Sequence, residues 1–414
     1  MKIAWGLTPL LIGCSTVPQH KAVSEPSPYL LLFVGDKDEA HEDFLAVADL
    51  RRPDRHIVAT TPVGLKASMP HHMEYWLPPR GELLFMNAHH AEQTLLVDVS
   101  VPTEPRVARR LQPPAPYRFT HDYWRLPNGN RLVGFLRSNG PSPVAGDKDN
   151  PGNHGGIAEY NADGELVRTA SAAVARYPKP LRPYAFAPLL EHDRLVTTSA
   201  TMMEENSADA VQIWRFSDLK LLHTLAMPKG DREYAERVPF EPRAMKDGSV
   251  LINAYGCGFY RLTGATGNAP KLTHLLTFAA EESNPKRRGA CGVPVVSGRW
   301  WLMPVGAANR IVTVDISDPA SPKQVAQFST PSDFRPHWMA KDPHSERIVV
   351  GAEFGGEQGM LVLRLDEDTG ALQPDQRIRS TDGRLGYFDL TQSHWPHGET
   401  GPGWAHAALF LPGR

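Results

Sequence analysis

The sequence has no surplus of positive charge. Its 414 residues include 44 Lys and Arg against 46 Asp and Glu, which gives a formal net charge of -2. A protein that binds nucleic acid needs an excess of cationic side chains to displace counterions from the phosphates. No nucleic-acid partner is therefore expected.

The sequence also has no long hydrophobic run, since no segment approaches the roughly 18 apolar residues of a membrane span. A shorter apolar stretch at residues 3–13 ends in Leu11-Ile12-Gly13-Cys14. This pattern is typical of a bacterial lipoprotein signal with Cys14 as the lipidated residue, and a plain secretory signal is the alternative. Either signal predicts a periplasmic protein, and the lipoprotein signal predicts that the protein contacts the membrane only through its lipid anchor.

The signal divides the chain into three parts. We expect residues 1–14 to be the signal peptide and residues 15–27, which contain several Pro and Ser, to be a flexible tether. Residues 28–414 should then form one folded domain, which we expect to be monomeric.

Cysteine is scarce, with three residues in the chain. If Cys14 carries lipid, Cys257 and Cys291 remain. A pair of cysteines in an oxidising compartment is first a candidate disulfide, then two buried thiols, and least often a pair of metal ligands.

Several common catalytic motifs are absent. The sequence contains no Gly-x-Ser-x-Gly elbow, no phosphate-binding glycine loop, no His-Glu-x-x-His helix and no dinucleotide fingerprint. The sequence therefore shows no binding motif for a cofactor other than a metal.

Turn-forming residues and short apolar strands are abundant instead. The 38 Pro and 34 Gly residues favour short strands over long helices. An apolar strand with polar alternation recurs roughly every 45 to 60 residues, which is the length of a four-stranded propeller blade. The recurring strand lies at residues 44–49, 95–100, 156–160, 211–216, 258–262, 311–316 and 360–365. The sequence therefore predicts an all-β, seven-bladed β-propeller, with a set of β-sandwiches as the alternative.

The C-terminal segment is expected to close the ring. In the first blade no strand precedes residues 29–33, which follow the tether directly, and residues 405–410 are left over at the other end of the chain. We expect residues 405–410 to fill the innermost position of the first blade, which removes an exposed sheet edge.

Four of the predicted innermost strands carry a histidine six positions before a proline. These histidines are His72, His121, His337 and His406. Innermost strands run side by side in the same direction, so equivalent positions should lie on one circle at one mouth of the channel. Neutral imidazoles converging there suit copper, iron or zinc, and a ring of hydrogen-bonded histidines without metal is the alternative.

Three carboxylates are expected near the same level. A metal-bound histidine usually donates its second N–H to a carboxylate or carbonyl, so Glu74, Asp122 and Glu241 are candidate partners of the ligands. The alternative for each is an ordinary solvated or salt-bridged carboxylate.

Further residues are expected on the face where the innermost strands begin. The long loop at 140–156 is a candidate lid. His71, His394 and His397 should crowd the entrance but fall out of register, so we expect them to be surface or outer histidines rather than ligands.

Several motifs, in order along the chain, resemble those of the selenium-binding protein and methanethiol oxidase family. The motifs are PHHME at 70–74, LPNG at 126–129, RPY at 182–184, VTTS at 196–199, VQIW at 211–214, SDLKLLHTL at 217–225, GCG at 256–258, CGVP at 291–294, DISDP at 315–319, PHW at 336–338 and WPHG at 395–398. The sequence departs from the family at 405–407, where Ala-His-Ala stands in place of Pro-His-Gly.

The resemblance implies a seven-bladed propeller. For the methanethiol oxidase members it also implies copper-dependent oxidation of a small thiol by O₂ to an aldehyde, hydrogen sulfide and hydrogen peroxide. The four histidines would then hold copper and be catalytic. Their arrangement also resembles that of the carotenoid oxygenase propellers, which hold Fe(II), so iron and zinc remain alternatives. A non-catalytic selenium or metal carrier, or an interaction scaffold, is the competing function.

Overall fold

The computed structural model describes residues 25–52, 56–139, 154–200, 208–278, 290–353, 359–399 and 401–413. The predicted signal peptide, including Cys14, and most of the candidate lid at 140–156 lie outside these ranges. In the described ranges, strands dominate and the helices are two short 3-10 turns, η1 (Leu190–His192) and η2 (Gly306–Ala308). No helix there is long and apolar enough to cross a membrane.

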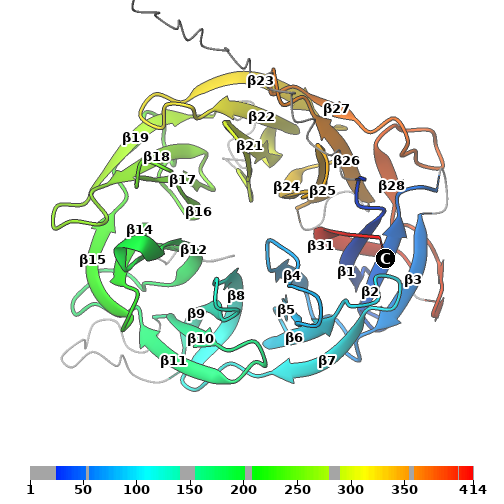
Figure 1. Ribbon diagram of the computed structural model, residues 1–414, viewed down its shortest axis with the longest axis horizontal. Helices are drawn as coiled ribbons and strands as arrows, with labels where there is room; N and C mark the ends of the chain where they lie inside the picture. Colours follow the sequence, from blue (N-terminus) through cyan, green and yellow to red (C-terminus); the bar gives the residue numbers. More distant parts are fainter. Residues whose placement is uncertain are drawn as a thin grey trace, which may run out of the picture.

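Seven antiparallel sheets form a ring around a central channel (Figure 1). The prediction of an all-β, seven-bladed propeller with four-stranded blades is therefore confirmed. The innermost strands, in the order of blades 1 to 7, are β31 (Gly403–Leu411), β4 (Pro70–Met73), β8 (Tyr117–Arg125), β12 (Pro183–Leu189), β16 (Pro239–Ala244), β20 (Val295–Ser297) and β24 (Pro336–Lys341).

Three further strands complete each blade outward from the channel. The second strands, in the same order, are β1 (Tyr29–Asp36), β5 (Leu84–Ala88), β9 (Arg131–Ser138), β13 (Arg194–Ser199), β17 (Val250–Ala254), β21 (Trp300–Val305) and β25 (Arg347–Ala352). The third strands are β2 (Phe44–Asp49), β6 (Gln93–Asp98), β10 (Gly156–Tyr160), β14 (Ala210–Arg215), β18 (Gly258–Thr263), β22 (Arg310–Asp315) and β26 (Gly359–Leu365). The outermost strands are β3 (Ile57–Pro62), β7 (Arg106–Leu111), β11 (Leu166–Ser171), β15 (Lys220–Ala226), β19 (Lys271–Thr277), β23 (Lys323–Ser329) and β27 (Leu372–Pro374).

One extra strand and one short hairpin lie outside the four-stranded blades. In blade 7, β28 (Tyr387–Asp389) also pairs with β26. A two-stranded hairpin, β29 (His394–Trp395) with β30 (Gly398–Glu399), precedes the last strand.

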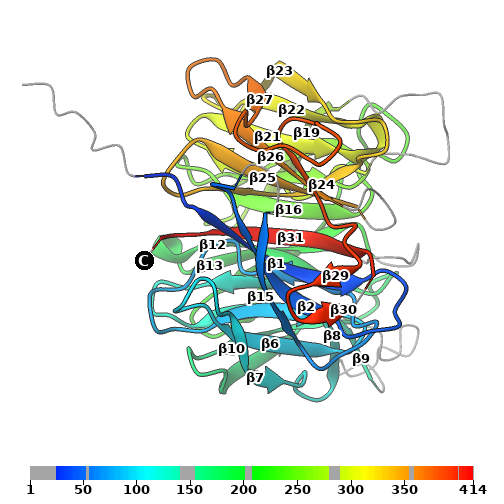
Figure 2. The same cartoon turned by 90° about the vertical axis from the view of Figure 1, so that its right-hand side faces the viewer.

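The C-terminal strand closes the ring as expected. β31 lies antiparallel to β1, with Tyr29 opposite Leu411 and Asp36 opposite Gly403. Figure 2 shows β31 running beside β1 through the molecule to the C-terminus. Because β1 belongs to the first blade and β31 to the end of the chain, this pairing joins the two ends of the propeller and covers the inner edge of β1.

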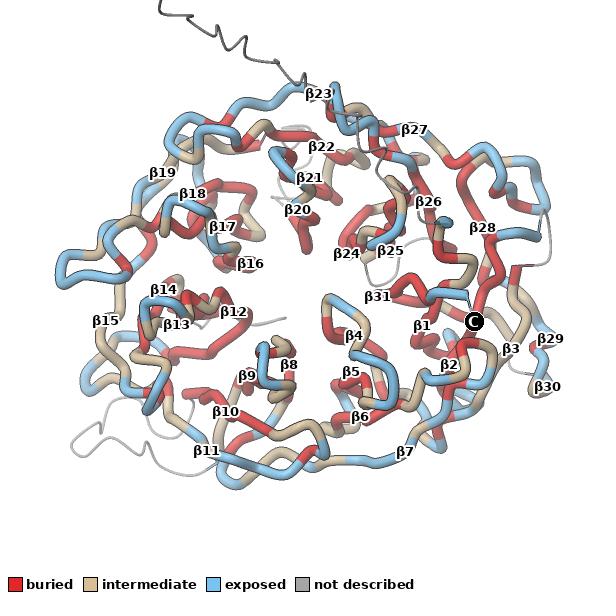
Figure 3. The backbone as a smooth tube through the Cα atoms, viewed as in Figure 1, coloured by how far each residue is buried: buried red, intermediate tan, exposed pale blue. Residues whose placement is uncertain are grey.

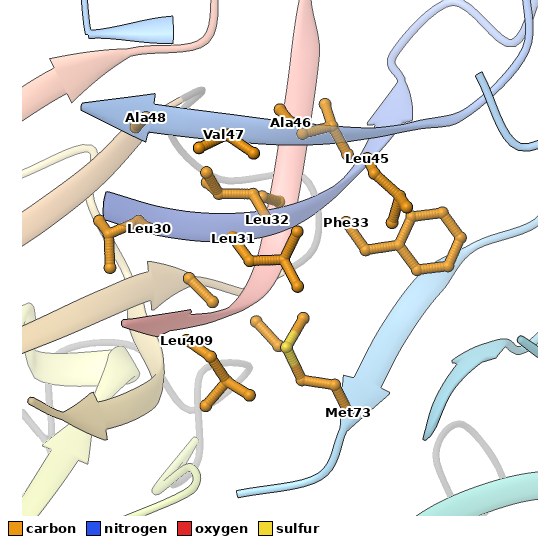
Figure 4. Close-up of a cluster of buried hydrophobic side chains, with 14 of the residues drawn as sticks. Leu30, Leu31, Leu32, Phe33, Leu45, Ala46, Val47, Ala48, Met73 and Leu409 are labelled. Atoms are coloured by element: carbon orange, nitrogen blue, oxygen red, sulfur yellow. The ribbon is translucent and has the colours of Figure 1, made fainter. Parts of the chain in front are cut away.

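The hydrophobic core lies on the inner strands and between neighbouring blades. Figure 3 shows the inner strands buried and the outermost ones largely exposed. In blade 1, the fully buried Leu30, Leu31 and Leu32 lie close to Leu409 of β31 and Met73 of β4 (Figure 4). Each such side chain stabilises the fold by roughly 1.5–3 kcal/mol relative to an exposed position. The blades therefore supply a core that does not depend on the channel.

The folded domain begins before the predicted end of the tether. Ser27, which we had expected to be the last residue of the tether, is buried, and its backbone N–H and hydroxyl donate to the Asp342 carboxylate at 2.9 Å and 2.7 Å. These bonds fix the start of the folded domain to the turn between β24 and β25.

Cys257 and Cys291 form a disulfide, with their Cα atoms 5.1 Å apart. Cys257 directly precedes β18 of blade 5, and Cys291 lies before β20 of blade 6, so the bond joins neighbouring blades. The disulfide interpretation is confirmed, and the alternatives of free thiols or thiolate ligands for these two residues are wrong.

Candidate metal centre

The structure brings the four predicted histidines together in the channel. His337 of β24, His406 of β31, His72 of β4 and His121 of β8 come from the contiguous blades 7, 1, 2 and 3, and each is at most 5% exposed. Their ring centroids follow the order of the blades, with 4.8 Å from His337 to His406, 5.8 Å from His406 to His72 and 4.2 Å from His72 to His121. The imidazoles therefore form one buried cluster.

Each of these histidines lies in a β-bulge. In β4 the register shifts between Pro70 and Met73, and β8 and β24 show the same kind of shift around their histidines. In β31 the extra residue falls in the segment that contains His406. A bulge interrupts the two-residue alternation of a strand and re-aims its side chains. The repeated bulge is the local reason why these side chains turn into the channel.

His71 also belongs to the cluster, so the prediction of a surface position is wrong, and His71 stands beside the predicted ligands as a further candidate. It is only 3% exposed, and its ring lies 4.2 Å from His72 and 4.3 Å from His406. One ring nitrogen from each of these three residues lies within 4.8 Å of the others. Regular alternation would send His71 and His72 to opposite sides of the strand, but both fall inside the bulge of β4.

His394 and His397 lie away from the cluster. His394 is exposed, and the ring Nδ1 of His397 lies 2.7 Å from the hydroxyl of Thr60 on the outermost strand β3. They are not at the channel entrance, where we had expected them. The expectation that they are peripheral rather than ligands agrees with their place on the rim of blade 1.

Several ring nitrogens in the cluster are buried without a hydrogen bond. The Nδ1–H of His121 donates to the carbonyl of Tyr184 at 3.0 Å, which leaves Nε2 as the lone-pair nitrogen. In the described part of the chain, this Nε2, both ring nitrogens of His72 and Nδ1 of His337 have no hydrogen-bond partner. A buried polar atom left unsatisfied costs about 1–3 kcal/mol. A metal ion would remove that cost for each nitrogen that it binds, so the residues fit a metal. In the described part of the chain, the histidines whose nitrogens lie close enough to share one ion are His71, His72 and His406, and His121 and His337 fall outside that group.

The imidazoles are held in the neutral form that binds metals. Burial lowers the pKa of His72, His121 and His406 well below the usual range, and neighbouring histidines lower it further. Nearby His89, whose Nδ1–H donates to the carbonyl of Thr120 at 3.1 Å, has a pKa that burial lowers to about 4. The cluster therefore offers neutral nitrogen donors at physiological pH.

Of the three predicted carboxylate partners, Asp122 lies within reach of a histidine. Its Oδ1 is 3.7 Å from Nδ1 of His72, and burial raises its pKa to about 7 while Arg243 opposes the shift. Glu241 instead accepts hydrogen bonds from the hydroxyl of Tyr75 and from Arg243, each at 2.8 Å. Burial also raises the pKa of Glu241 to about 7, against the opposing charge of Arg243. Both carboxylates are fully buried in the channel.

The prediction that Glu74 supports a metal ligand is wrong. Its carboxylate lies between blades 2 and 3, where it pairs with Arg125 at 2.7 Å and Arg131 at 3.3 Å and accepts the backbone N–H of Phe85 at 2.9 Å. Among the described residues it contacts no histidine. The physical reason is that β4 ends at Met73, so the strand alternation no longer directs Glu74 into the channel.

Sequence reasoning missed Asn87, which positions two of the histidines. This buried side chain, on β5, accepts the backbone N–H of His72 at 2.7 Å through Oδ1. Its Nδ2 donates to the carbonyls of Thr120 and His121, each at 3.0 Å. One amide therefore joins the bulges of β4 and β8. Nothing in the local sequence distinguishes it, because its partners come from two other strands.

Replacing Asn87 with Ala should lower metal affinity about tenfold and the free energy of unfolding by about 1–3 kcal/mol. The substitution removes three hydrogen bonds around the bulges, although the carbonyl of Thr120 keeps its bond from His89, and it loosens both histidines. Metal titration and urea unfolding would measure the two effects.

Asn253→Ala is the matched control. Asn253 is buried at the equivalent position of β17, and its Nδ2 donates to the carbonyl of Gly292 at 3.0 Å in a part of the ring whose innermost strand carries no histidine. The Asn253→Ala variant should be less stable than the wild type but should keep its metal. Unchanged metal affinity in the Asn87 variant would contradict the positioning role.

Comparisons with known proteins agree on the architecture. No protein-family model and no curated protein sequence matches the chain. The X-ray structure of a hypothetical selenium-binding protein from Sulfolobus tokodaii is similar, with a TM-score of 0.71 and 15% sequence identity over 93% of this chain and 94% of that one. The periplasmic gluconolactonase PpgL of Pseudomonas aeruginosa has a TM-score of 0.60 and 14% identity over 92% of this chain and 98% of that one.

Identities this low show the fold alone. The chain is a seven-bladed β-propeller with a buried cluster of histidines in its channel, and its fold is that of the selenium-binding-like propeller from Sulfolobus. The fold by itself assigns no activity, because propellers of this kind carry several functions.

Proposed function

We propose that the histidine cluster binds a redox-active transition metal, copper first, and that the protein oxidises a small sulfur compound such as methanethiol with O₂. The observation that carries the metal site is the convergence of buried imidazoles from four contiguous blades with ring nitrogens left unsatisfied. The resemblance of the sequence motifs to methanethiol oxidases supports the choice of substrate.

The donor set favours copper, iron or zinc over harder cations. Most candidate ligands in the cluster are imidazole nitrogens, with the Asp122 carboxylate as an oxygen donor beside His72, whereas magnesium and calcium prefer sites made of oxygen. Cys257 and Cys291 offer no thiolate because they are joined in a disulfide. Iron is the alternative metal for the oxidase, zinc would fit the histidines but only in a non-catalytic carrier, and metal analysis of the purified protein decides among the three.

Aromatic side chains surround the imidazoles and keep water from them. The ring of Tyr184 lies 3.7 Å from that of His121 and stacks on Phe240 at 4.6 Å. The ring of Trp338 meets His72 edge-on at 5.0 Å. The carbonyl of Tyr184 also fixes the orientation of His121, as partners of metal-bound histidines commonly do.

The proposed reaction balances with water as a co-reactant. Methanethiol, O₂ and water give formaldehyde, hydrogen sulfide and hydrogen peroxide, so the C–S bond breaks, a C=O bond forms, and O₂ takes up the electrons lost by carbon. Bound copper would supply redox chemistry and would lower the pKa of the thiol. The carboxylate of Asp122, whose pKa burial raises to about 7, can hold a proton beside His72.

Metal analysis combined with an oxygen electrode tests the proposal. The purified protein should contain copper, consume O₂ when methanethiol is added, and release hydrogen sulfide and hydrogen peroxide. Chelated protein should be inactive and should recover with copper but not with zinc, because zinc has no redox chemistry. Equal O₂ uptake by the zinc-loaded protein would contradict the assignment.

The competing function is a non-catalytic carrier of metal or selenium. Such a protein would bind metal at the same histidines but would consume no O₂ with any small thiol. Metal binding without turnover would therefore favour the carrier, and absence of metal binding would reject both functions.

We further propose that the protein is exported and anchored by lipid on Cys14. The disulfide between Cys257 and Cys291 supports export, because disulfides persist mainly in oxidising compartments. A Cys14→Ser variant should move from the membrane fraction to the soluble fraction on cell fractionation. An unchanged distribution would reject the anchor.

A further inference from the structure

A second group of metal-binding side chains lies at the seam where the ring closes, outside the histidine cluster. Asp36 is the last residue of β1, and it pairs with Gly403 at the start of β31. Asp38 and His41 follow in the turn between β1 and β2. One potential ligand atom from each of these three side chains lies within 4.8 Å of the others.

Asp36 is the unusual member, because a buried carboxylate oxygen has no partner. The residue is 1% exposed, and its Oδ2 accepts the backbone N–H of His41 at 2.7 Å. Its Oδ1 is buried and accepts no hydrogen bond from the described residues. Leaving such an atom unsatisfied is costly, and a cation is one group that can satisfy it.

The two carboxylates also face the same side. A Cβ placed on Gly401 would lie 3.6 Å from Oδ2 of Asp38 and 4.0 Å from Oδ1 of Asp36. Burial raises the pKa of Asp36, the backbone N–H of His41 opposes the shift, and the carboxyl group of Asp38 adds to the rise through a side-chain hydrogen bond that needs a shared proton and through its charge. A bound cation would stabilise two neighbouring carboxylates of which one has an unsatisfied oxygen.

We propose that Asp36, Asp38 and His41 bind one divalent transition-metal ion of the Mn²⁺ or Zn²⁺ class. Two carboxylates and one imidazole form a mixed oxygen and nitrogen set that these ions accept, whereas the imidazole disfavours Mg²⁺ and Ca²⁺. Asp38 and His41 are exposed, so an ion can reach the site from solvent.

The position of the site gives it a structural role. It lies at the end of β1 opposite the start of β31, and His406 follows Gly401 by only five positions in the sequence. An ion there neutralises the two carboxylates at the seam and stabilises the closed ring. This role is independent of the proposed oxidase activity, since it uses none of the channel histidines.

Manganese binding by the full-length protein tests the site. Protein treated with chelator and dialysed against Mn²⁺ should retain one more equivalent in the wild type than in Asp38→Asn or His41→Ala. The wild type and both variants have the same channel histidines, so any Mn²⁺ bound there does not contribute to the difference in Mn²⁺ content. At Mn²⁺ concentrations about 100 times Kd, the melting temperature of the wild type should rise by roughly 2–4 °C, and that of the two variants should not.

Asp318→Asn is the matched control. Asp38 accepts the backbone N–H of Ala40 at 3.0 Å, and the exposed Asp318 makes the same turn contact with Ala320 at 2.9 Å. The Asp318 variant should bind Mn²⁺ like the wild type. Equal Mn²⁺ content in the wild type and the Asp38 variant would overturn the site, and wild-type binding by the His41 variant would overturn the imidazole as a ligand.

Discussion

Replacing His121 with Ala should lower metal affinity by at least about 100-fold and abolish oxidase activity, while the propeller stays folded. Altering only the hydrogen-bond partner of a metal-bound histidine already costs 10–100-fold in affinity, and here the donor itself is lost. His121 presents Nε2 to the cluster because its Nδ1–H is held by the carbonyl of Tyr184. The fold should survive because the core lies on and between the blades rather than in the channel.

The measurement combines copper, iron and zinc analysis with O₂ uptake and melting temperature. His397→Ala is the control, because His397 lies on the rim of blade 1 beside Thr60 and should keep its metal and activity. A structural role for His121 would show the reverse pattern, with a lower melting temperature and unchanged metal content. Equal metal content in the wild type and both variants would reject the assignment of His121 as a ligand.

The blade architecture could be predicted from the sequence because its signals are local and repeated. Each blade carries an apolar strand of period two between turns, and the repeat length fixes the number of blades. The closing strand followed from an empty position in the first blade, and β31 occupies it. The four channel histidines were found because they share one register relative to a proline.

The errors arose where the local geometry departs from a regular strand. His71 was assigned to the channel entrance as a surface or outer histidine because it falls out of register with the other four, but the bulge in β4 brings both His71 and His72 into the cluster. A β-bulge depends on how a strand pairs with its neighbour, so the sequence of the strand alone does not reveal it. Asn87 was missed for a similar reason, since its partners lie on β4 and β8.

Glu74 shows how a tertiary partner can override a sequence pattern. It lies two positions after His72, so a continued strand would direct it into the channel. Instead β4 ends, and the carboxylate forms ion pairs with the guanidinium groups of Arg125 and Arg131 from blade 3. Burial raises the pKa of Glu74 even though both arginines oppose the shift, so desolvation outweighs the attraction of its partners.

Replacing Glu74 with Ala should therefore destabilise the propeller by about 3–5 kcal/mol without changing its metal content. Removing one partner of a buried ion pair leaves the other charge poorly compensated, because the side chain of Arg131 is fully buried and its remaining carboxylate partner, Glu82, lies 3.4 Å away and is 30% exposed. Urea unfolding would measure the loss of stability, and metal analysis of the folded variant would test whether the histidine cluster is intact.

Glu82→Ala is the control because Glu82 pairs with the same two arginines from a more exposed position. Its side chain is 30% exposed, and it contacts Arg125 closely and Arg131 at 3.4 Å. Solvent screens such a pair, so its loss should cost no more than about 1 kcal/mol. Equal destabilisation by the two substitutions would show that burial of Glu74 is not the source of the effect. A loss of metal in the Glu74 variant alone would restore Glu74 as a partner of the histidines.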